Sequence, residues 1–245
     1  MPIPIAVEAA ASNRFLAALP ENEFLKIQSS LEYVRFEAGD TLWESGEKAK
    51  HLYFPTTSLI SLLYESEAGT SISIATIGRS GIVGTNLVLG EARTPDKAVV
   101  QYSGSAFRMD VDSVEEELAN CGDFQSLLMA YTQVLIIKIS QNAICNRLHR
   151  IEQQLARWIL DCSDDLETTE LAMTHEQVAS VLGVRRESIS LAMSQLQNRK
   201  IINGGRGKIA IWDAAALKAT SCECYSLVKQ QLETSLKKYV RRRPN

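Results

Sequence analysis

Hydrophobic positions change their spacing near residue 33. Between Asn13 and Leu31, apolar side chains recur at three- and four-residue steps, which predicts a helix. Further on, short apolar runs alternate with turns such as Gly39-Asp40, and the segment TSISIATI (70–77) alternates strictly. These runs predict strands at 34–36, 42–43, 52–54, 59–64, 71–77, 99–102 and 106–109. Seven short strands at this spacing indicate a sandwich or barrel.

A helical pattern covers Asp123 to Asp161, where neither Gly nor Pro occurs and apolar residues recur at three- and four-residue steps. It predicts one long helix, or two with a slight break, spanning on the order of 55 Å. Because one small domain needs a shorter helix for its own packing, part of the apolar face is expected to meet a second copy of the chain. Polar residues interrupt this apolar face. They either fix the register between paired helices or lie exposed to solvent where the apolar stripe turns away from the partner helix. The expected dimer seam comprises Leu128, Tyr131, Leu135, Lys138 and Asn142.

The stretch from Met173 to Trp212 predicts a winged helix-turn-helix. Thr174 and Gln177 have the spacing of a capping box, and Gly183 supplies the backbone freedom that a sharp turn between two helices requires. In the second helix, Ile189, Ala192, Met193 and Leu196 form the apolar face. The segment that follows has hairpin chemistry around its Asn-Gly-Gly-Arg-Gly run at 203–207.

The other face of the second helix is free to contact DNA. The recognition helix of such a unit lies in the major groove, where Arg pairs with guanine and Glu accepts from cytosine. Arg186 and Glu187 are therefore expected to read bases, and His175, in the first turn of the first helix, to contact a phosphate. The expected DNA-contacting residues are Thr174, His175, Arg185, Arg186, Glu187, Ser188, Ser190, Arg206 and Lys208.

Charge distribution agrees with this interpretation. From Met173 to Asn245 there are 13 Lys and Arg against 5 Asp and Glu, whereas the rest of the chain carries 13 against 24. A basic module attached to an acidic remainder is typical of a DNA-binding domain. The alternative, two surface helices and a hairpin with merely solvated charges, does not account for this asymmetry.

Composition further narrows the class of protein to which the chain can belong. The 245 residues are 45% hydrophobic, which predicts about two domains, and the absence of a long apolar run or a basic leader predicts a cytoplasmic protein without membrane contact.

The five cysteines are dispersed and expected to be reduced. Cys222 and Cys224 form a C-x-C pair without a second pair, so inert buried thiols are favoured over a metal site, and His149 is expected to be ordinary. No catalytic motif occurs, so an enzyme is not expected.

The order of these parts, with Phe36-Glu37-Ala38-Gly39-Asp40 and Ser45-Gly46 in the strand region, resembles the Crp/Fnr family of bacterial transcription regulators. The resemblance is strongest in CNRLHRIEQQLARWILD (145–161), THEQVASVLGVRRESIS (174–190) and SCECY (221–225). It implies an α+β chain: a cyclic-nucleotide-binding-like β-roll (1–122), a dimerisation helix (123–161) and a winged helix-turn-helix domain (162–245). The implied partners are double-stranded DNA with an inverted-repeat operator, a second copy of the chain, and RNA polymerase.

The sensor half departs from members of the family that bind cyclic AMP. Their Gly-Glu-Leu segment aligns with Gly78, Arg79 and Ser80, and their phosphate-binding Arg-Ser pair with Asp96-Lys97. A cation thus replaces the ribose-binding carboxylate, so the resemblance implies an unknown effector at these positions, or none, rather than cyclic AMP. An iron–sulfur cluster is not expected, because no Cys precedes Cys121. The alternative function is a cyclic-nucleotide-binding-like signalling module that acts through protein partners.

Overall fold

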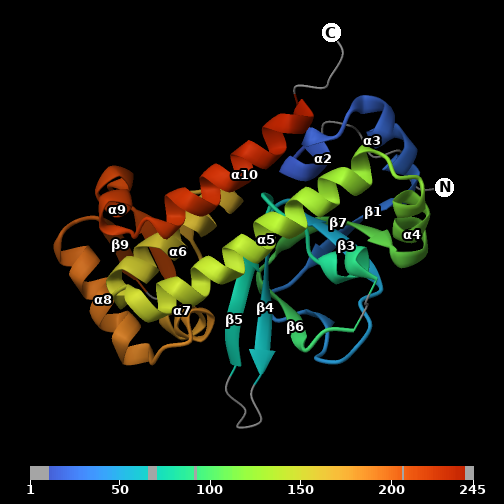
Figure 1. The fold of residues 1–245 in the computed structure, drawn as a ribbon. Coiled ribbons are helices and arrows are strands. Elements are labelled where there is room, and N and C mark those ends of the chain that lie inside the picture. Colours follow the sequence, from blue (N-terminus) through green and yellow to red (C-terminus); the bar gives the residue numbers. More distant parts are fainter. Residues whose placement is uncertain (1–10, 66–70, 91–92, 206, 241–245) are drawn as a thin grey trace.

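The computed structural model describes residues 11–65, 71–90, 93–205 and 207–240. A strand-rich N-terminal part and a helical C-terminal part lie at opposite ends of the molecule, and the long helix α5 connects them (Figure 1). The α+β architecture expected from the sequence is confirmed.

The N-terminal part is a roll of two antiparallel sheets, with strand orders β1-β7-β3 and β2-β6-β4-β5. Their apolar faces share a core that includes Phe54, Phe107, Ile60 and Met109. The prediction of seven strands is confirmed, because each predicted run lies within an observed strand. The strands are β1 (Leu31–Phe36), β2 (Thr41–Trp43), β3 (His51–Pro55), β4 (Leu59–Glu65), β5 (Ser71–Ile77), β6 (Asp96–Tyr102) and β7 (Gly104–Asp110), with the short helix η2 (Thr85–Leu89) before β6 and α4 (Val111–Ala119) after β7.

The segment from Asn13 to Leu31 is helical as predicted, but it is not one continuous helix. The segment forms α2 (Arg14–Ala18), α3 (Glu21–Ile27) and the 3₁₀ turn η1 (Gln28–Ser30). Pro20 causes the break, because a residue before proline is driven into an extended conformation, and Leu19 has ψ 141°. Asn13 caps α2 by accepting from the N–H groups of Phe15 and Leu16.

The segment 123–161 forms two helices with a break between them, which is the second of the two alternatives that the sequence left open. The helix α5 (Asp123–Leu148) ends at His149, where ψ is 151°, and α6 (Ile151–Leu166) begins after Arg150. Gln154 stabilises the break, because its Nε2 donates to the carbonyl oxygens of Cys145 and His149. The helix α6 packs in the core of the C-terminal part, so the break separates the two parts of the chain.

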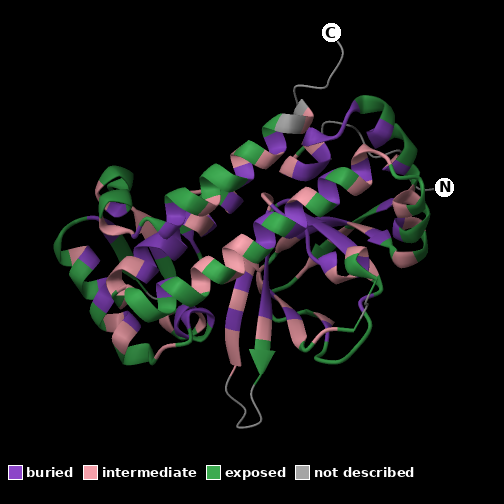
Figure 2. Cartoon of the chain, in the orientation of Figure 1, coloured by how far each residue is buried: buried purple, intermediate pink, exposed green. Residues whose placement is uncertain are grey.

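The predicted dimer seam is wrong, because its apolar residues are buried within one chain. Leu128, Tyr131 and Leu135 are only 1%, 4% and 6% exposed and belong to the core of the roll. Lys138 and Asn142 are half-buried, and they donate to the carbonyl oxygens of Thr76 and Ile74 at the edge of the sheet formed by β5. Exposed and buried residues alternate along α5 (Figure 2), so another face of this helix is available to a partner.

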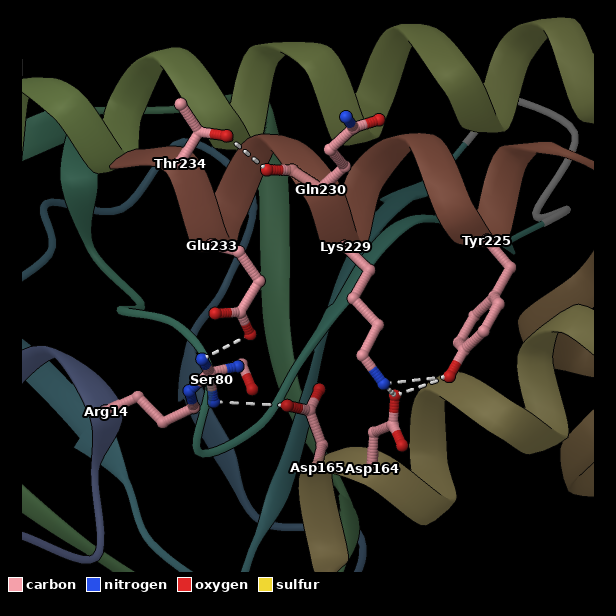
Figure 3. Close-up of polar contacts among 9 residues, drawn as sticks. All are labelled: Arg14, Ser80, Asp164, Asp165, Tyr225, Lys229, Gln230, Glu233 and Thr234. Carbon is pink, nitrogen blue, oxygen red and sulfur yellow. Dashed lines mark hydrogen bonds and ion pairs between the residues drawn. The ribbon is translucent and has the colours of Figure 1, made fainter. Parts of the chain in front are cut away.

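A C-terminal helix that the sequence interpretation missed, α10 (Cys224–Val240), lies alongside α5 (Figure 1). Its Leu232 and Leu236 complete the core of the roll. Polar contacts join α10 to two further helices (Figure 3): Glu233 pairs with Arg14 of α2 at 2.6 Å, and Asp164 of α6 accepts from Lys229 at 2.6 Å and from Tyr225 at 2.8 Å. The helix α10 thus ties both parts of the chain together.

By length and hydropathy alone, α5 could cross a membrane. Its apolar residues have another role in this fold, because the helix packs against η2, β5 and α10.

Candidate DNA-binding site

The first helix of the candidate site, α7 (His175–Leu182), begins and ends where the sequence predicts. Thr174 accepts from the N–H of Gln177 and its own N–H donates to the Gln177 side chain, which completes the capping box. Gly183 then has φ +65°, a conformation that strains residues with a Cβ. The backbone turns there into the second helix, α8 (Arg186–Asn198).

The helix α8 has the two faces that the sequence predicts. Ile189, Ala192, Met193 and Leu196 are buried, together with residues of α6 and α7. Its N-terminal end is open to solvent: Arg185, Arg186 and Glu187 are exposed, and Ser188 and Ser190 are half-buried. Leu191, 63% exposed, lies beside them on the outer face.

A three-stranded sheet of order β8-β10-β9 forms the wing, from β8 (Glu170–Leu171), β9 (Ile202–Gly205) and β10 (Lys208–Ile211), with α9 (Ala214–Thr220) after it. Gln197 of α8 donates to the carbonyl oxygen of Gly204, which fixes the wing to the recognition helix. Lys208 pairs with Glu170 at 2.6 Å, and both side chains are largely exposed. Arg206, also expected to contact DNA, lies outside the described residues.

One concave surface brings several predicted residues together. Thr174, His175 and Arg186 line it with Gly204 and Gly205 of the wing. The Nδ1 atom of His175 lies 3.1 Å from Oγ of Ser190, so the two helix N-termini are linked directly. The surface suits DNA, because helix N-termini attract phosphate and Arg186 can reach a base edge.

The sequence interpretation missed Glu176, which lies on the same surface. Its Oε2 is 3.9 Å from Nε of Arg186, and both side chains are more than half exposed. An exposed pair of this kind contributes little to stability and leaves Arg186 free to exchange partners. Its sequence signal was an acidic residue in the first turn of α7, ten positions before the arginine.

The candidate effector residues lie between the roll and α6. Arg79 donates from Nε to the carbonyl oxygen of Ser12 and forms an ion pair with Glu167, and the N–H of Ser80 donates to Asp165 at 3.1 Å. A Cβ at Gly78 would come within 2.6 Å of the Asp165 side chain. These three residues therefore join the roll to the DNA-binding half of the chain.

Two family models match the chain in the order of its parts. The cyclic nucleotide-binding domain matches residues 33–121, and the Crp-like helix-turn-helix domain matches residues 153–220. The global nitrogen regulator of Nostoc sp. is 23% identical over 190 residues, which are 72% of this chain and 83% of the relative. The transcriptional regulator SdrP of Thermus thermophilus is 22% identical over 194 residues, covering 76% and 93%.

Solved structures have the same fold. A Crp/Fnr-family regulator from Eubacterium rectale has a TM-score of 0.64 at 14% identity, covering 86% of this chain and 98% of that one. A Crp/Fnr-family regulator from Thermus thermophilus has a TM-score of 0.63 at 20% identity, covering 78% and 98%. Fold, site and relatives together define a DNA-binding transcription regulator. The chain belongs to the Crp/Fnr family.

Proposed function

We propose that the protein is a homodimer that binds an inverted-repeat operator through α7, α8 and the wing. The observation that carries this proposal is the shared surface of Thr174, His175, Arg186 and the wing glycines. Arg186 and Glu187 read base edges, with Ser190 beside them. His175 and the N-terminus of α7 contact the phosphate backbone, while Arg185, Ser188, Arg206 and Lys208 add flanking contacts.

A second copy of the chain docks on the exposed face of α5. Met129, Ile136, Ile144 and Leu148 are 46–72% exposed there, whereas the opposite face is buried in the chain's own core. Ser140 lies between them on the same side of the helix. Pairing two such faces about a two-fold axis buries the apolar side chains and places two recognition helices on one side of the dimer.

The sensor half responds to an input other than cyclic AMP in its usual pose. The side chain of Arg79 is engaged by Ser12 and Glu167, and no carboxylate stands at the positions that the family resemblance aligns with the ribose. We expect the protein to act in the cytoplasm by binding rather than by catalysis, and to affect transcription through RNA polymerase.

Selection from a pool of random duplexes tests the proposal. Two related half-sites should emerge in inverted orientation, with centres roughly 10–11 base pairs apart, because a dimer places its recognition helices about 34 Å apart. Affinity for the selected duplex should fall steeply as salt rises, since phosphate contacts release counterions. Enrichment of a single half-site, or salt-independent binding, would contradict the dimer or the DNA interface respectively.

Calorimetry with cyclic AMP tests the proposed input. No heat is expected at sub-millimolar nucleotide. Tight binding with a matching gain in DNA affinity would overturn this part of the proposal, because coupling between two ligands is reciprocal.

A further inference from the structure

Four side chains with metal-ligating atoms meet where α5 ends. Cys145 and His149 come from the last turn of α5 and its cap, and Cys222 and Cys224 come from the segment that enters α10. Their ligand atoms all lie within 4.8 Å of one another. The two Sγ atoms of Cys145 and Cys222 are 3.5 Å apart, and Sγ of Cys224 is 3.6 Å from Nδ1 of His149.

These separations fit one tetrahedral ion. With Zn–S bonds of about 2.3 Å and a Zn–N bond of about 2.0 Å, tetrahedral geometry places neighbouring ligand atoms roughly 3.5–3.8 Å apart. A disulfide requires about 2.05 Å between the sulfurs, and the cysteines are free thiols. An iron–sulfur cluster needs ligands on more than one iron, so its thiolates have to lie farther apart than the ligands of one ion.

The surroundings of the cluster have two further features of a zinc site. The Nε2 atom of His149, on the far side of the ring from Cys224, lies 3.3 Å from Oε1 of Glu223; a carboxylate on the second ring nitrogen is the usual partner of a metal-ligating histidine. The three cysteines are at most 4% exposed and form a small cluster of their own, outside both hydrophobic cores.

Charge also balances. Three thiolates and one Zn²⁺ leave a single net negative charge, and the buried guanidinium of Arg157, which interacts electrostatically with Cys145 and Cys224, offsets it. From the sequence alone, Cys222 and Cys224 are expected to be inert thiols, because a zinc site needs two more ligands. Of these, Cys145 lies 77 positions before Cys222, so the spacing in the sequence does not reveal it.

We propose that Cys145, His149, Cys222 and Cys224 bind a structural Zn²⁺ ion that fastens the start of α10 to the break between α5 and α6. The protein supplies all four ligands, so no position is open for substrate. The ion closes a long loop of chain and fixes the joint between the sensor half and the DNA-binding half. Its binding free energy is therefore part of the folding free energy.

Elemental analysis of the full chain, purified in reductant without chelator, tests the site. Roughly one zinc per chain is expected in the wild type. The double variant Cys222→Ser/Cys224→Ser should lose the metal, whereas Cys121→Ser, at an exposed cysteine outside the cluster, should retain it. Iron with inorganic sulfide, a Cys145–Cys222 disulfide in protein kept reduced, or equal zinc in all variants would overturn the proposal.

A second measurement covers the case in which the double variant does not fold. Wild-type protein stripped of metal and titrated with Co²⁺ should develop tetrahedral d–d bands and thiolate charge-transfer absorption at one equivalent. Glu223→Gln should weaken zinc affinity by roughly 10–100-fold, because it changes only the partner of His149. The matched control is Glu115→Gln, at an exposed glutamate on α4. Absence of the cobalt spectrum, or equal affinity in Glu223→Gln and the control, would refute the site.

Discussion

Ile72 of β5 lies directly against Gly183, the residue at the turn of the helix-turn-helix. A Cβ added at Gly183 would come within 2.8 Å of two carbons of the Ile72 side chain. The turn that positions the recognition helix is therefore packed on a strand of the N-terminal roll. Any change in β5 that moves Ile72 would alter the support beneath α7 and α8, which gives the two halves of the regulator a direct mechanical contact.

Gly183→Ala should destabilise the protein in two separable ways. The positive φ costs about 1–2 kcal/mol for a residue with a Cβ, and the contact with Ile72 adds a steric cost. In an Ile72→Ala background the steric part should disappear and the conformational part remain. Urea unfolding of the four proteins of this double-mutant cycle measures both parts. Equal losses in the two backgrounds would show that Gly183 and Ile72 do not touch in solution.

Arg186→Ala and Lys208→Ala should affect DNA binding differently. Loss of a bidentate base contact at Arg186 should cost about 1–3 kcal/mol on the selected operator and relax preference at one base pair per half-site. Loss of Lys208, on the wing, should weaken all duplexes alike and reduce the salt slope. Titration of both variants against a panel of single-base operator variants distinguishes these effects. If both lost affinity evenly across the panel, Arg186 would not be a base-reading residue.

Local signals predicted the DNA-binding unit closely, because each acts within a few residues of its cause. The capping box at Thr174, the turn at Gly183 and the buried face through Ile189 depend on neighbours in the sequence. The helix α10 also had a local signal, since Val228, Leu232 and Leu236 recur every four residues. That spacing would have predicted the helix, although not its place beside α5.

Long-range relationships could not be predicted in the same way. Apolar residues surround much of α5, so periodicity does not say which face meets the chain's own roll and which meets a second copy. Lys138 and Asn142 bond to β5 carbonyls about 60–70 positions earlier in the chain. The ligand cluster around Cys145 depends on α10 returning along α5, which no spacing within the sequence shows.

Asp161 should make stability pH-dependent between about pH 4 and pH 6. Burial raises the pKa of this carboxyl to about 6; the positive charges of Arg157 and Lys138 oppose the rise, and Asp165 and Asp164 add to it. A folded pKa above the unfolded value of about 3.9 means that the native state binds more protons in this window, so this contribution to stability is present below pH 4 and lost as pH rises through 6.

The Asn substitution isolates this contribution. Because Asp161→Asn removes the titrating group, the free energy of unfolding of the wild type should fall relative to that of the variant as pH rises from 4 to 6. Chemical unfolding at half-unit pH intervals measures the difference. Parallel curves would show that Asp161 titrates normally in the folded protein.

Ile136 and Leu135 are neighbours on α5, and the same substitution at each should have opposite consequences. Ile136 is 58% exposed on the proposed dimer face, whereas Leu135 is 6% exposed in the core of the roll. Ile136→Glu should give folded monomers with wild-type circular dichroism. Their operator affinity should collapse, because each half-site offers few contacts and the linked second binding event is lost. Leu135→Glu should instead lower the thermal midpoint sharply or prevent folding, because it buries an unpaired carboxylate. Sedimentation equilibrium and thermal unfolding of both variants measure the contrast, and a dimeric Ile136→Glu protein with full operator affinity would place the dimer interface elsewhere.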